Sequence, residues 1–77
     1  MTITAKTESG ATYIFTQKDG RTIFQKGILC GEVIRSSPIS IGKRITMDFH
    51  KEDLYGNLET STMFVNTTPV TELSVIL

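Results

Sequence analysis

The sequence lacks several features that whole classes of protein require. Its single cysteine, Cys30, allows no disulfide within the chain and fits a reducing cytoplasm. Lys and Arg total 8, and Asp and Glu also total 8, so there is no basic excess to drive nonspecific nucleic-acid binding. No apolar run approaches the roughly 20 residues that cross a membrane, and residues 1–6 lack the apolar core of a signal peptide. We therefore expect a cytoplasmic chain with no membrane contact.

Residues for nucleophilic or metal chemistry are scarce. Cys30 and the only histidine, His50, form the one conceivable nucleophile–base pair, but a small buried thiol is the favoured interpretation. His50, Glu52 and Asp53 cluster in the sequence, yet a structural zinc site needs about four ligands including thiolate or imidazole. A solvated loop is therefore expected there. No metal, cofactor or catalytic residue is predicted.

The acidic residues do not suggest acid–base catalysis. They are scattered over predicted turns and strand exteriors, and general acid–base chemistry needs a positioned pair with separated pKa values. Glu32, beside Val33 and Ile34, is the one carboxylate whose apolar neighbours favour a raised pKa. We therefore expect a protein that is not an enzyme.

What the sequence does contain in abundance is residues branched at Cβ. Ile, Val and Thr total 25 of 77 residues, whereas Ala occurs twice, and this composition suits strands. The six glycines are spaced like turns between short strands. The pattern predicts a single all-β domain over residues 1–77, with five to six short antiparallel strands. So short a chain favours a curved sheet or partly open barrel of SH3-like or OB-like size.

The individual strands follow from alternation and turn residues. Gly31 is expected to break the fourth segment into two pieces, and Pro69 to separate the last two strands. The predicted strands are 2–7, 11–17, 21–26, 44–50, 58–66 and 70–77, with two short strand pieces at 28–30 and 32–35.

Two turns predict the register of the first three strands. Asp19-Gly20 is a strong two-residue hairpin signal, and it places Phe15 opposite Phe24. Read as another two-residue loop, Ser9-Gly10 places Lys6 opposite Tyr13.

This register gives the sheet two faces that both carry apolar groups. One face holds Ile3, Ala5, Ile14 and Ile23, and the other holds Lys6, Tyr13, Phe15, Phe24 and Lys26. The pattern leaves open which face is the core. A second apolar face and an apolar final strand predict a homo-oligomer, most simply a dimer.

The first candidate binding group is Lys6, Tyr13 and Lys26. Aromatic rings between cations on one sheet face can stack bases and neutralise phosphate, so this face suits a nucleotide or a short single strand. The favoured alternative is that Phe15 and Phe24 belong to the core and that Tyr13 lies at its boundary.

The second candidate group is Arg35, Lys43 and Arg44. Serines lie near these cations in the sequence, and Gly42 allows backbone N–H groups to approach an anion, so the group could hold a phosphate. A surface turn between strands is the favoured alternative.

Three segments together resemble small all-β proteins of bacteriophages and prophages. These segments are Thr7-Glu8-Ser9-Gly10-Ala11-Thr12-Tyr13, Ile41-Gly42-Lys43-Arg44-Ile45 and Thr67-Thr68-Pro69-Val70-Thr71-Glu72-Leu73. The resemblance implies an accessory role in an infected cell and brings no catalytic residues with it.

The sequence thus favours a non-enzymatic binding module. The leading hypothesis is a phage-type accessory or inhibitor protein that binds a host protein. The alternative is a module that binds a nucleotide or short oligonucleotide through its aromatic and basic residues.

Overall fold

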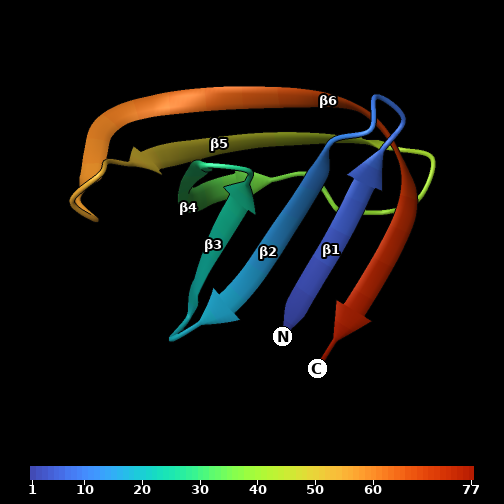
Figure 1. The fold of residues 1–77 in the computed structure, drawn as a ribbon, viewed down its shortest axis with the longest axis horizontal. Coiled ribbons are helices and arrows are strands. Elements are labelled where there is room, and N and C mark those ends of the chain that lie inside the picture. Colours follow the sequence, from blue (N-terminus) through green and yellow to red (C-terminus); the bar gives the residue numbers. More distant parts are fainter.

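The computed structural model describes residues 1–77 and consists of strands joined by turns. The strands are β1 (Thr2–Thr7), β2 (Thr12–Lys18), β3 (Arg21–Lys26), β4 (Leu29–Ser36), β5 (Arg44–Glu52) and β6 (Leu58–Ile76). All neighbours are antiparallel, and the order β1-β2-β3-β4-β5-β6 closes on itself through β6 and β1 (Figure 1). The predicted all-β fold is confirmed. The chain forms no helix that is long and apolar enough to span a membrane.

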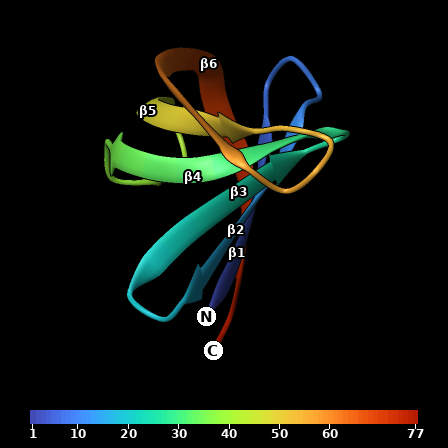
Figure 2. The same ribbon diagram turned by 90° about the vertical axis from the view of Figure 1, so that its left-hand side faces the viewer.

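The ring of strands consists of two groups that run in different directions. β1, β2, β3 and the C-terminal half of β6 form one group, and β4, β5 and the N-terminal half of β6 form the other (Figure 1). Viewed from the side, the two groups diverge from each other (Figure 2). β6 belongs to both groups because it bends between them.

The prediction of two strands separated by Pro69 was wrong, because Leu58–Ile76 is one continuous strand. Pro69 lies where β6 passes from pairing with β5 to pairing with β1, opposite Arg44. Proline has no N–H to donate, but its carbonyl remains useful and accepts a hydrogen bond from Glu8 N–H at 2.9 Å. Proline is therefore tolerated where the strand changes partner.

Gly31 also lies within a continuous strand, so the predicted break in β4 was wrong. A Cβ at this position would collide with the backbone carbonyl of His50 on β5. Glycine is needed here because β4 and β5 approach closely, which allows the strand to continue.

The Asp19-Gly20 hairpin has the predicted register, with Phe15 opposite Phe24. Asp19 and Gly20 have φ angles of 53° and 74°, as a type I′ turn requires.

The predicted β1–β2 register was wrong by one residue, because Tyr13 lies opposite Ala5 and not Lys6. The hairpin is closed by Thr7 N–H donating to the Ala11 carbonyl at 2.9 Å, and Gly10 has a φ of 90°. The loop therefore has three residues with glycine in the left-handed region, which moves every pairing by one position.

This shift settles which sheet face is the core. Ala5 joins the aromatic face inside the barrel, whereas Lys6 turns outward and Ile14 is exposed. The rings of Phe24 and Phe49 meet edge-on, with their centroids 4.6 Å apart. The core consists of Ala5, Tyr13, Phe15, Phe24, Ile45, Met47, Phe49 and Val70.

We expect Phe24→Ala to lower the free energy of unfolding by about 3–5 kcal/mol, because it leaves a cavity in a core with few alternative contacts. Phe15→Ala should behave similarly, since both rings are at most 3% exposed. Urea denaturation followed by circular dichroism measures the loss. Ile28→Ala, on a fully exposed side chain, is the control. A loss below about 1 kcal/mol for both phenylalanine variants would contradict this packing.

Candidate binding surfaces

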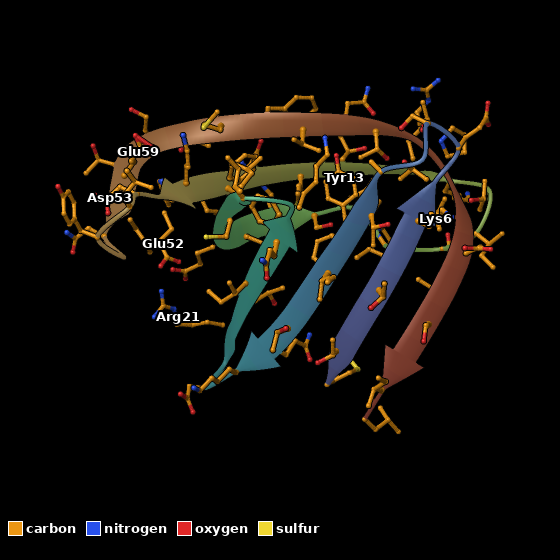
Figure 3. The ribbon with its side chains drawn as sticks, viewed as in Figure 1. Lys6, Tyr13, Arg21, Glu52, Asp53 and Glu59 are labelled. Atoms are coloured by element: carbon orange, nitrogen blue, oxygen red, sulfur yellow. The ribbon has the colours of Figure 1, made fainter.

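The structure separates Lys6 from Tyr13 and Lys26. Tyr13 is buried and stacks on Phe15, with centroids 6.4 Å apart, while Lys26 Nζ lies 5.5 Å from the centre of the Tyr13 ring. Lys6 lies on the outer surface with its Nζ 4.0 Å from Glu72 Oε2 (Figure 3). The interpretation of the aromatic residues as core is confirmed, so no open stacking platform lies between these cations.

The structure does not gather Arg35, Lys43 and Arg44 into one site. Arg35 Nη2 donates to Asp48 Oδ2 at 3.2 Å, across the β4–β5 ladder. Arg44 Nη1 donates to the Thr67 carbonyl at 3.1 Å. The Lys43 carbonyl accepts from Val70 N–H at 2.9 Å, and its side chain is exposed. A cavity beside Arg35 is lined by neither Lys43 nor Arg44.

Sequence reasoning missed an ion pair between Arg21 of β3 and Glu32 of β4. Arg21 Nη2 lies 2.5 Å from Glu32 Oε2. The hydrogen bond from Arg21 holds the pKa of Glu32 below its usual value, although partial desolvation opposes this effect. The raised pKa expected for Glu32 was therefore wrong, because its cross-strand partner outweighs its apolar sequence neighbours.

The thiol of Cys30 does not face His50. Its Sγ donates weakly to Glu52 Oε2 at 3.8 Å, and His50 Nδ1 lies 3.1 Å from the Ser61 carbonyl. Burial raises the pKa of Cys30, and the Glu52 charge raises it further. A thiol whose pKa is raised is a poor nucleophile at neutral pH. The structure also brings together no group of three His, Cys, Asp or Glu residues that could hold a metal ion.

Hydrogen bonds to Ser37 show the direction in which the backbone N–H and C=O groups of β5 point. Ser37 N–H donates to the Thr46 carbonyl at 2.8 Å, and Thr46 N–H donates to Ser37 Oγ at 3.0 Å. The backbone of Thr46 thus faces the β4 side. Because this direction alternates along a strand, Met47 and Phe49 face β6.

The same alternation identifies an open edge on β6. Val65 and Met63 pair with Met47 and Phe49, so their backbone groups face β5. β1 pairs with β6 only from Val70 to Ile76, so no strand runs along the other side of Leu58–Asn66. We call this unpaired side of Leu58–Asn66 the β6 edge. The residues whose backbone N–H and C=O groups point outward along it are Thr62, Phe64 and Asn66.

Exposed apolar side chains accompany the β6 edge. Phe64 is 62% exposed, and Met63 and Leu58 are also exposed. The β5–β6 turn carries exposed Leu54 and Tyr55 and projects from the barrel with Glu52, Asp53 and Glu59 beside it (Figure 3). The β6 edge and its side chains thus form an apolar strip bordered by acidic groups.

The turn beside this strip is ordered by one carboxylate. Asp53 Oδ1 accepts hydrogen bonds from Tyr55 N–H at 2.8 Å and from Asn57 N–H at 2.9 Å. Such a side-chain cap fixes a tight turn, so Tyr55 has a defined backbone despite its exposure.

Comparison of the chain with protein-family models, curated proteins and solved structures gives no match.

We expect the Glu32 ion pair to make stability depend on pH. Glu32 has a lowered pKa in the folded state, so its contribution is present above the usual carboxyl value of 4.5 and is lost as the pH falls through the folded-state value. Glu32→Gln should therefore lose this part of the acid dependence. Thermal melts of the parent chain and of Glu32→Gln, at pH values from about 7 to about 3, measure this difference in pH dependence. Arg21→Gln should show the same weakened pH dependence as Glu32→Gln. A melting temperature that changes with pH in the same way in all three proteins would contradict the ion pair.

We expect Cys30 to react slowly with iodoacetamide. Its raised pKa leaves less thiolate at neutral pH than a cysteine at the usual 9.0 would have. Mass spectrometry of the alkylated fraction over time, against a short unstructured cysteine peptide, gives the relative rate. Glu52→Gln should move the pH profile of alkylation to lower pH, because it removes the carboxylate charge. A reaction as fast as that of the peptide would be inconsistent with this environment.

Proposed function

We propose that this chain is a non-catalytic protein-binding module that accepts an extended segment of a partner protein as an added strand on the β6 edge. The observation that carries the proposal is the row of outward backbone groups at Thr62, Phe64 and Asn66. Main-chain hydrogen bonds supply affinity in strand addition, and neighbouring side chains supply specificity.

Between Thr62 and Asn66 the β6 edge has none of the usual protection against pairing. Charges, prolines and bulges normally blunt an exposed edge strand. Leu58–Asn66 contains no proline and one charged residue, Glu59, and its pairing with β5 is regular from Thr62 to Asn66. Exposed Phe64 and Met63 add apolar area beside the backbone donors and acceptors. These features favour a protein partner over a small polar ligand.

The condition of the titratable groups supports binding in preference to catalysis. Burial and the Glu52 charge raise the pKa of Cys30, Glu32 is ion-paired with Arg21, and His50 lies against a backbone carbonyl. None of these groups is paired with a second one as nucleophile and base. The nucleotide alternative loses support because Tyr13 and the phenylalanines of its face are core residues.

The resemblance to phage proteins directs the search for the partner to proteins of a bacterial host, in an accessory or inhibitory role. A second copy of the chain could occupy the same edge, which would form the homodimer expected from the sequence. The mass of the parent chain in solution distinguishes the two occupants.

The test uses substitutions that close the edge without breaking the β5 ladder. Thr62→Pro removes an N–H that faces away from β5, and Phe64→Lys places a charge on the strip. The parent chain, fixed on a column, retains its partner protein. We expect the amount that each variant retains to be lower by about tenfold or more. Ile14→Lys, on an exposed apolar residue of β2, is the matched control and should retain it. Equal retention by all four proteins would contradict the proposal.

Light scattering of the same proteins tests the homodimer. A mass of 8.5 kDa for the parent chain means that the edge is unoccupied by a second copy. A doubled mass that returns to 8.5 kDa in Thr62→Pro places the dimer at the β6 edge. Melting curves must show that each variant is folded.

A further inference from the structure

The barrel wall is incomplete where β3 and β4 separate. Their pairing runs from Lys26–Leu29 to Ile23–Glu32 and stops there, although β4 continues to Ser36. Thr22 therefore pairs only with Gln17 of β2. This separation coincides with the divergence of the two groups of strands (Figure 2).

The barrel interior is under-filled at this end. Gln17 and Thr22 lie two residues from Phe15 and Phe24 and on the same side of their strands, but Gln17 is exposed and Thr22 is only half-buried. A barrel of this size is normally filled by its side chains. A cavity of about 340 Å³ remains, and its inner wall is formed by Ile3, Phe15, Gln17, Thr22, Val33 and Ile39.

The rim of this cavity carries one cationic side chain, that of Arg35. Its side chain is 80% exposed and donates one hydrogen bond, from Nη2 to Asp48 Oδ2. A guanidinium has five N–H donors, so Arg35 can also bind an anion at the rim. The Ser37 hydroxyl is already engaged, because it accepts from Thr46 N–H and donates to the Arg44 carbonyl.

We propose that this cavity, the barrel mouth, binds a small amphipathic anion. The apolar body of the ligand lies against Ile3, Val33 and Ile39, and its carboxylate, sulfonate or phosphate group pairs with Arg35. The volume is at the lower end of the range for small-molecule sites, so the apolar body is limited to one short aliphatic chain. Nucleotides fit less well because Phe15, the only aromatic residue of the wall, is 3% exposed and offers no stacking face.

The barrel mouth is separate from the β6 edge. Its lining residues come from the N-terminus, β1 to β4 and the segment after β4, and none comes from β6. Arg35 also borders a second hollow that Phe64 lines, so the independent pair of variants is Thr22→Leu for the barrel mouth and Thr62→Pro for the β6 edge.

The test is a titration of the protein with octanoate, followed by amide NMR spectra. We expect the largest shifts at Val33, Arg35 and Ile39, and weaker binding of 1-octanol, which has the same chain without the charge. Arg35→Gln should weaken octanoate binding about fivefold and leave 1-octanol binding unchanged. Arg44→Gln removes a charge that does not line the cavity and should bind octanoate as the parent chain does.

Thr22→Leu fills the cavity and should abolish binding of both compounds. The proposal is overturned if octanoate shifts map outside the barrel mouth, if octanoate and 1-octanol bind equally, or if Arg35→Gln binds octanoate unchanged. Arg35 is exposed, so Arg35→Gln should fold. It therefore tests the proposal even if Thr22→Leu does not fold.

Discussion

The contact between Phe24 and Phe49 holds the two groups of strands together. Phe24 belongs to β3, in one group of strands, and Phe49 belongs to β5, in the other. Their rings pack edge-on and so connect the two groups. Gly31 allows this contact, because the close approach of β4 to β5 beside it leaves no room for a side chain. A core of eight buried apolar residues depends on these positions, so the small domain has little redundancy in its packing.

The two proposed sites are consequences of how unevenly the ring closes. β6 is longer than the segment that pairs with either neighbour, because β5 pairs with its first half and β1 pairs with its second half. The first half therefore keeps an unpaired edge. β4 likewise continues beyond the end of its pairing with β3, which opens the barrel mouth. Each opening lies where one strand continues beyond the end of the strand that it pairs with. The β6 edge offers unpaired backbone groups, and the barrel mouth offers a cavity.

The two glycine turns show how far local sequence can fix a register. Asp19-Gly20 predicted its hairpin correctly, because a positive φ at both positions matches only one common turn. Ser9-Gly10 predicted the wrong pairing, because the same glycine also fits a three-residue loop closed by Thr7 and Ala11. Choosing between these loops depends on burying Ala5 beside Tyr13, which is a tertiary effect.

The sequence by itself determined the all-β class and the Phe15–Phe24 pairing, because strand composition and strict turn chemistry are local properties. Tertiary structure decided the rest. The ion pair between Arg21 and Glu32, the separation of Arg35 from Lys43 and Arg44, and the burial of Tyr13 all depend on which strands become neighbours. The β6 edge was invisible in the sequence for the same physical reason: whether a backbone group is free is set by where the adjacent strand ends.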